Sequence, residues 1–161
     1  MAEDKQQYKR VLLLPIDDSE DSENTVIWAL ENLFRPGGDL LYFLHVVPER
    51  QFEVIGGDAA ETIVEEDVSA EQQVVEDAKN FITNRILQLA EQRQAPNKVE
   101  IVRFRTDAKS VGDVIIERAA TLGAAAVVMK KHAVGAIRAF FVGSATEHVA
   151  QHCKQPVVVL H

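Results

Sequence analysis

Two stretches of this sequence carry residues of the kinds that bind anions. In the first, Asp17-Asp18-Ser19 directly follows an apolar run. In the second, Lys130-Lys131-His132 follows the apolar run Ala124–Met129, and Gly143-Ser144 then opens a predicted helix. A strand, a glycine-bearing loop and a helix start favour phosphate binding, because free backbone N–H groups and the positive helix end point at the ligand. The second stretch therefore predicts a phosphate site.

Both stretches also have a purely structural interpretation, which the residues leave open. Ser144-Ala145-Thr146-Glu147 matches the capping box of an ordinary helix start. Asp17 and Asp18 are equally suited to accept hydrogen bonds from the free N–H groups of a first helix turn.

Other candidate residues give weaker signals. His148 and His152 have a spacing that suits metal ligands on a helix, but no third ligand is evident, so we predict no metal site. His45 lies inside an apolar run and is interpreted as a hydrogen-bonded core residue. The sequence lacks the motifs of common NTPases, hydrolases, kinases and metalloproteases, so we predict that the protein is not an enzyme.

The elements that must position these residues alternate between strands and helices. Helices are expected after Asp17, over Ser69–Gln94, from Ser110 to a stop at Gly123, and from Ser144. Five strands are predicted between them: Lys9–Asp17, Leu40–Val47, Val99–Arg105, Ala124–Met129 and Pro156–His161. This order predicts an α/β fold, a three-layer α/β/α sandwich around a doubly wound, five-stranded parallel sheet. Ligands bind such a sheet where the strand order reverses, beyond the carboxyl ends of the strands.

The composition fits a single globular domain. The chain has 161 residues, of which 47% are hydrophobic and 26% charged. We predict a short tail over residues 1–8 and one domain over residues 9–161. No apolar run approaches the ~20 residues that span a bilayer, and the single cysteine excludes an internal disulfide, so we expect a cytoplasmic protein without membrane contact.

The charge is distributed unevenly along the chain. The net charge is −8, and the segment from Gln51 to Ala78 has acids but no bases. Its nine acids are Glu53, Asp58, Glu61, Glu65, Glu66, Asp67, Glu71, Glu76 and Asp77. We predict that residues 51–66 form a mobile acidic loop. An acidic chain without a basic stripe argues against nucleic-acid binding.

Three of these segments resemble the universal stress protein family. Pro15-Ile16-Asp17-Asp18-Ser19-Glu20 is similar to the V-D-x-S-E-like stretch after the family's first strand, and Leu44-His45-Val46 to the L-H-V end of its second. The family's C-terminal signature is G-x-x-G, nine residues, then G-[ST], and here Val128-Met129-Lys130-Lys131-His132-Ala133 is followed by nine residues and Gly143-Ser144. The resemblance implies an adenine nucleotide alpha hydrolase-like fold with strand order 3-2-1-4-5.

The resemblance also implies a role for each position of the family's binding site. Asp17 would accept a hydrogen bond from the adenine amino group, Val46 would line the adenine and ribose pocket, and Met129 would lie under the ribose. The positions implied to surround the phosphates are Lys130, Ala133, Gly143, Ser144, Ala145 and Thr146. The implied ligand is ATP or AMP, with Mg²⁺ only for ATP.

Lys130 and Ala133 depart from this pattern, because they replace both glycines of its first pair. Glycine is needed where backbone approaches a ligand closely, and Lys130 adds a long side chain at that place. Family members without these glycines are regarded as not binding ATP. We therefore predict a non-enzymatic interaction or scaffold domain with a degenerate nucleotide site. We expect it to be an accessory part of a larger assembly, either cytoskeletal or of another kind.

Two alternatives to this function remain. In the first, the chain is an ATP- or AMP-binding stress-response sensor, in which the Lys130 ammonium holds the phosphate as a point charge. In the second, it is a slow ATPase that uses Asp17 or Asp18.

The last predicted strand is a candidate interface. The resemblance implies that two chains pair through this strand, which would otherwise be an unprotected sheet edge. Its residues are Val157, Val158, Val159 and Leu160. We predict a homodimer, or a heterodimer with another protein, through these residues.

Overall fold

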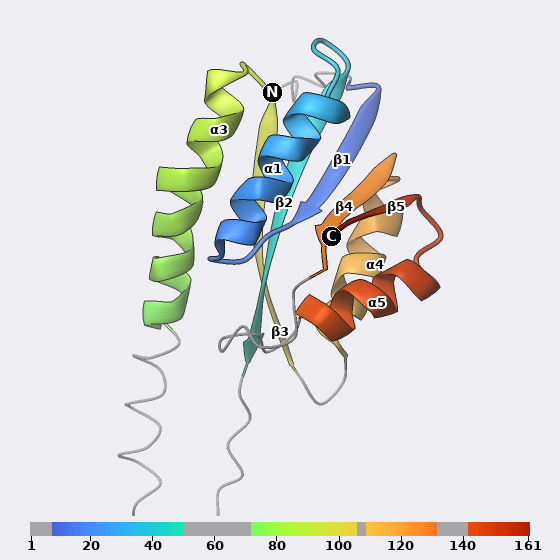
Figure 1. Ribbon diagram of the computed structural model, residues 1–161. Coiled ribbons are helices and arrows are strands. Elements are labelled where there is room, and N and C mark those ends of the chain that lie inside the picture. Colours follow the sequence, from blue (N-terminus) through green and yellow to red (C-terminus); the bar gives the residue numbers. More distant parts are fainter. Residues whose placement is uncertain (1–7, 50–71, 106–108, 132–141) are drawn as a thin grey trace, which may run out of the picture.

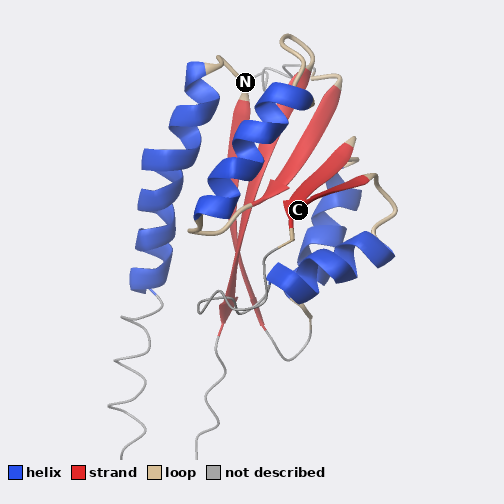
Figure 2. Ribbon diagram, viewed as in Figure 1, coloured by secondary structure: helices blue, strands red, loops and turns tan. Residues whose placement is uncertain are grey.

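The computed structural model describes residues 8–49, 72–105, 109–131 and 142–161. They form a parallel sheet of β1 (Arg10–Pro15), β2 (Asp39–Glu49), β3 (Asn97–Arg105), β4 (Ala126–Lys130) and β5 (Val157–Leu160), in the order β3-β2-β1-β4-β5. Helices cover both faces of this sheet (Figure 2). The predicted α/β fold and strand order are confirmed. The predicted acidic loop, residues 51–66, lies outside the described residues.

The helices are divided between the two faces of the sheet. On one face, α1 (Glu20–Asn32) lies beside the helix of residues 72–92, which ends as α3 (Leu87–Gln92) (Figure 1). On the other face lie α4 (Val111–Leu122) and α5 (Val142–His152) (Figure 1). None of the helices among the described residues is long and apolar enough to cross a membrane.

Local sequence explains where α1 and α4 begin and end. Ser19 precedes α1 with extended backbone, and its hydroxyl accepts a hydrogen bond from the Ser22 N–H at 3.3 Å. Ser110 and Asp113 form a capping box at the start of α4. Gly123, with a φ of 57°, ends α4 in the left-handed conformation that glycine adopts without strain.

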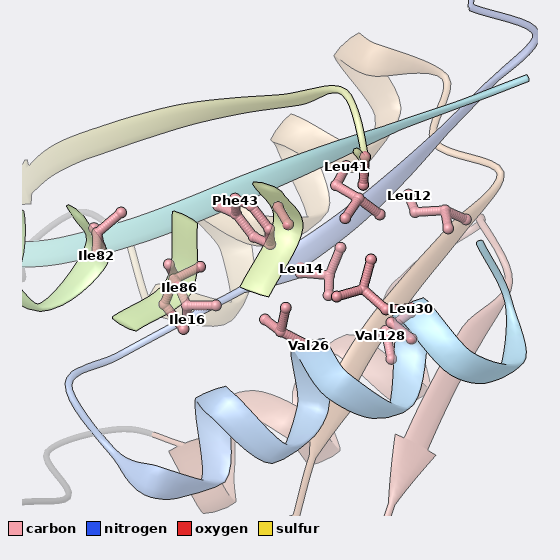
Figure 3. Close-up of a cluster of buried hydrophobic side chains, with 13 residues drawn as sticks. Leu12, Leu14, Ile16, Val26, Leu30, Leu41, Phe43, Ile82, Ile86 and Val128 are labelled. Atoms are coloured by element: carbon pink, nitrogen blue, oxygen red, sulfur yellow. The ribbon is translucent and has the colours of Figure 1, made fainter. Parts of the chain in front are cut away.

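Two hydrophobic clusters fill the space between the sheet and the helices. Side chains alternate along β1, so Leu12 and Leu14 join the cluster under α1 while Leu13 joins the cluster under α4 and α5. Figure 3 shows Leu14 of the first cluster with Phe43, Val26 and other buried side chains around it. Because helices cover both faces, β1 needs apolar residues on both, and this explains its continuous apolar run.

The helix of residues 72–92 contains a π turn, η1 (Ile82–Ile86). Its buried residues Ala78, Ile82, Ile86 and Ala90 follow one another at a constant spacing of four. In a regular α-helix, twelve residues at ~100° each turn about 120° beyond three whole turns, which would carry Ala90 away from the face of Ala78. The wider π turn takes up one extra residue, or ~100°, so that all four side chains face the core.

An ion pair joins the amino ends of β1 and β2. The Asp39 carboxylate, which is 1% exposed, accepts hydrogen bonds from Arg10 Nε at 2.8 Å and Arg10 Nη2 at 2.5 Å, and from the Arg35 N–H at 2.9 Å. Burial alone would raise the pKa of Asp39, but the bonds from Arg10 and Arg35 outweigh it and lower the pKa below its ordinary value. Arg10 also donates to the Leu33 carbonyl, so this pair fixes the end of α1 as well.

Two predicted helix boundaries need correction. The last helix begins at Val142, because Val142 and Gly143 already have helical backbone, so Ser144 lies inside its first turn and is not its cap. The helix predicted to end at Gln94 ends at Gln92, because Gln94 adopts a positive φ of 49° that helical backbone excludes. Both differences are of one or two residues and leave the fold unchanged.

Candidate functional site

The carboxyl ends of β1 and β4 lie side by side at the point where the strand order reverses. β1 pairs with β2 on one side and with β4 on the other. The chain leaves β1 toward α1 and leaves β4 toward α5, on opposite faces of the sheet. Residues that follow these two strands are therefore brought together, as the sequence predicts for this class of sheet.

Asp17 organises the loop that follows β1. Its Oδ1 atom accepts hydrogen bonds from the Ser22 hydroxyl at 2.6 Å, from the Ser19 N–H at 3.2 Å and from the Ser19 hydroxyl. The Asp17 N–H in turn donates to the Ser22 hydroxyl at 2.8 Å. This network holds the loop against the first turn of α1, as the structural interpretation of Asp17 predicts. Asp18 is exposed beside it.

Lys130, at the end of β4, forms an ion pair with Asp21. Its ammonium lies 2.6 Å from Asp21 Oδ1, in the first turn of α1, and the two side chains are 26% and 32% exposed. Asp21 is a functional candidate that the sequence interpretation missed. The only signal for it is its position in an acidic first helix turn, because 109 residues separate it from Lys130.

Hydrogen bonds from α5 and to β5 fix the backbone around Lys130. The Lys130 carbonyl accepts a hydrogen bond from the hydroxyl of buried Thr146, in the first half of α5, at 3.2 Å. The Lys131 N–H donates to the carbonyl of Leu160, at the end of β5, at 2.8 Å. These two hydrogen bonds hold the backbone at Lys130 in place.

The other predicted nucleotide-binding residues are distributed around this point. Met129 and Ala145 are buried among the side chains under α4 and α5, and Val46 is half-buried near the end of β2. Gly143 and Ser144 contribute backbone to the first turn of α5, and Ala133 lies outside the described residues.

His45 joins the carboxyl ends of β1 and β2. Its ring donates from Nδ1 to the carbonyl of Ile16 at 2.8 Å. The hydrogen bond agrees with the interpretation of His45, but the side chain is half-buried and is not part of either core cluster, so its predicted place in the core is wrong. This bond holds in place the backbone that leads into Asp17.

His148 and His152 have partners other than a metal. The His148 ring donates from Nε2 to Asp113 Oδ1 at 2.8 Å, and the His152 ring donates from Nδ1 to the His148 carbonyl at 2.9 Å. The described residues bring together no group of three His, Cys, Asp or Glu side chains suited to a metal ion. Hydrogen bonds from the Ser110 N–H and hydroxyl, and from His148, lower the pKa of Asp113 to about 2.

Gly112 allows α4 and α5 to approach each other at this pair. A Cβ atom at Gly112 would lie 2.7 Å from Cδ2 of His148, well inside a normal contact. The glycine therefore leaves the space that the His148 ring occupies. In this way the Asp113–His148 contact connects the two helices on this face of the sheet.

β5 is an edge strand, as the interface hypothesis requires. It pairs only with β4 among the described strands, and each of its four residues is half-buried. Cys153 directly follows the last residue of α5, His152, and is half-buried.

Comparisons with known proteins agree with this architecture. The model of the universal stress protein family matches residues 7–161. Universal stress protein PHOS32 of Arabidopsis thaliana is 30% identical over 163 residues, which cover 94% of this chain. The chain spans 64% of the length of that relative.

Two solved structures show the same fold. Hypothetical protein MJ0577 superimposes with a TM-score of 0.71 at 22% identity, covering 94% of this chain and 95% of that one. The universal stress protein from Archaeoglobus fulgidus in complex with dAMP gives a TM-score of 0.56 at 18% identity, covering 94% and 98%. With the family model matched over nearly the whole length, this chain belongs to the universal stress protein family.

Proposed function

We propose that this chain is a non-enzymatic interaction domain whose nucleotide site is degenerate. One observation carries the proposal: the residue that replaces the first glycine of the family's phosphate loop, Lys130, is paired with Asp21 at 2.6 Å. A nucleotide phosphate would have to separate this pair before it could use the ammonium. The Lys130 side chain thus adds bulk at the phosphate position without offering an unmatched charge.

The surrounding charge also disfavours a nucleotide. The described residues just beyond β1 and β4 include four carboxylates, Asp17, Asp18, Glu20 and Asp21, against the two lysines Lys130 and Lys131. A phosphate group carries roughly two negative charges near pH 7, so it would enter a region that is already negative.

The alternative is an ATP- or AMP-binding sensor. It is supported by the A. fulgidus relative, which was solved with dAMP. It is also supported by the start of α5, because free backbone N–H groups at a helix start can bind a phosphate and Thr146 holds this helix against the end of β4. In this alternative, the phosphate displaces Asp21 and takes over the Lys130 ammonium.

Calorimetric titration of the nucleotide-stripped protein with ATP and AMP, with and without Mg²⁺, separates the two functions. We expect no saturable heat up to millimolar nucleotide from the folded protein. The reversion Lys130→Gly with Ala133→Gly is expected to create affinity. Micromolar binding to the natural sequence that is lost on reversion would instead establish Lys130 as a phosphate ligand and refute the degenerate site.

We also propose that the domain does not hydrolyse ATP. The Asp17 carboxylate, the best candidate for a catalytic group, already accepts three hydrogen bonds at Oδ1 from Ser19 and Ser22. Phosphate release from ATP is expected to equal that of a heat-inactivated control. Release above that control, abolished by Asp17→Asn, would refute this part of the proposal.

The proposed interaction surface is the edge of β5 that pairs with no other strand among the described residues. Its apolar residues, Val157–Leu160, favour pairing with a second copy of the chain or with another protein of a larger assembly. We place this role in the cytoplasm, since a chain with one cysteine forms no internal disulfide and so needs no oxidising compartment.

A further inference from the structure

Among the surface ion pairs of the described residues, the Lys130–Asp21 pair differs in its position. It joins the end of β4 to the first turn of α1, and so crosses the point where the strand order reverses. The pairs between Arg85 and Glu23 and between Arg93 and Glu31 instead link two neighbouring helices along one face. Ligands of doubly wound sheets bind at the crossing that Lys130 and Asp21 occupy.

The geometry restricts what the Lys130 ammonium can reach. Its Cα is held by the hydrogen bond from Thr146 to its carbonyl, and β4 pairs with β5 up to Lys130 and Leu160. About three quarters of the Lys130 side chain is shielded from water, since 26% is exposed. The ammonium is therefore confined to the space between the end of β4 and the start of α1, where the Asp21 carboxylate meets it.

A carboxylate and a phosphate bind an ammonium in the same way. Both offer anionic oxygens, and lysine interacts with either as a compact point charge. Asp21 is therefore chemically equivalent to the oxyanion that a lysine at this position would otherwise attract. When an oxyanion approaches, the Asp21 charge opposes it twice: it occupies the ammonium and repels the ligand.

We propose that Asp21 is a built-in counter-ion of a latent oxyanion site, and that neutralising its carboxylate opens the end of β4 to a phosphate group. The inference rests on the degenerate site proposed above and names the residue that keeps it closed. The ligand class is a phosphate oxyanion, either free or as the phosphate of a nucleotide.

Asp21→Asn tests the proposal, because it removes the charge with little change in shape. Glu20→Gln is the matched control, since it removes the same charge from the same turn of α1 and leaves the Lys130–Asp21 pair intact. The natural protein and both variants are titrated calorimetrically with sodium phosphate, AMP and adenosine. Equal thermal unfolding profiles establish that all three are folded.

We expect Asp21→Asn to bind phosphate and AMP at least tenfold more tightly than the natural protein, with adenosine unchanged. A gain for phosphate alone identifies free phosphate as the ligand source, and a gain for AMP alone identifies a nucleotide. Combining Asp21→Asn with Lys130→Gln is expected to abolish the gain. An equal gain in Glu20→Gln, a gain that survives Lys130→Gln, or no gain in folded Asp21→Asn would overturn the proposal.

The titrations distinguish a failure of the Asp21 proposal from a failure of the proposed function. Micromolar binding of AMP to the natural protein refutes the degenerate site whatever Asp21→Asn does. Absence of binding to both the natural protein and Asp21→Asn refutes only the role of Asp21.

Discussion

Asp39→Ala removes the carboxylate at the centre of the ion pair that joins β1, β2 and the end of α1. The substitution deletes three hydrogen bonds, two from Arg10 and one from the Arg35 N–H. Removing one partner of a buried ion pair costs ~3–5 kcal/mol, because the other charge is left without a partner. Arg10 is 29% exposed and keeps its bond to the Leu33 carbonyl, so water can reach it. We therefore expect a loss near the lower limit, ~3 kcal/mol.

Urea unfolding at pH 7 measures this loss as a shift of the midpoint at constant slope. The matched control is Glu31→Ala, which breaks the pair of Glu31 with Arg93 at 3.4 Å, where both side chains are more than half exposed. A pair so exposed contributes less than ~1 kcal/mol. If Asp39→Ala lowers the free energy of unfolding no more than Glu31→Ala does, the reasoning from burial is wrong.

The same variant has a defined pH dependence. The folded protein lowers the pKa of Asp39 below its ordinary value of 3.8. The contribution of the ionised carboxylate is therefore fully present above that value and is lost as the pH falls through the lower, folded-state pKa. We expect the difference in unfolding free energy between the natural protein and Asp39→Ala to shrink as the pH falls below 3.8. A difference that stays constant down to the acid-unfolding limit would contradict the assigned cause.

Three further predictions concern α4, α5 and β5. Gly112→Ala is expected to destabilise the fold by ~1 kcal/mol in urea unfolding, because the added Cβ collides with the His148 ring, and His148→Ala is expected to relieve this cost. The stabilisation from ionised Asp113, whose pKa is about 2, is expected to be present above its ordinary pKa of 3.8 and to be lost as the pH falls toward 2, so that the natural protein and Asp113→Ala converge in unfolding free energy over that range. Val159→Lys is expected to convert a dimer into a monomer in light scattering at micromolar concentration, because it places a charge in the proposed strand interface.

Each of these has a result that would contradict it. If Gly112→Ala destabilises the fold as much in a protein that also carries His148→Ala as it does alone, the contact with the ring is not the cause. Unfolding free energies of the natural protein and Asp113→Ala that differ by a constant amount across the acid range would argue against the assigned ionisation. A natural protein that is already monomeric would refute the interface, whatever Val159→Lys does.

The sequence predicts the sheet and its helices because their signals are local. The apolar run of β1 follows from burial on both faces, and the caps Ser19 and Ser110 each bond to a residue only three positions further along the chain. Once the strands are predicted, their carboxyl ends are known, and the candidate site is expected at those ends. Only the identity of the strand neighbours required the family resemblance.

The contacts that define the site could not be predicted in the same way. Lys130 and Asp21 are 109 residues apart and His148 and Asp113 are 35 apart, so nothing in their spacing marks them as partners. Such pairs depend on how helices are placed over the sheet, which is decided by packing. The start of α5 was misplaced for a related reason, because Val142 and Gly143 carry no capping signal of their own.

The π turn in the helix of residues 72–92 has a consequence for comparing this chain with its relatives. A relative whose helix is regular through residues 82–86 reaches the same core positions with one residue fewer. If the two sequences are aligned without a gap at the π turn, the residues on one side of the turn are shifted by one position. Core positions of one chain are then matched to surface positions of the other. Ala78 and Ala90 can therefore both be aligned correctly with such a relative only if a single-residue gap is placed between them.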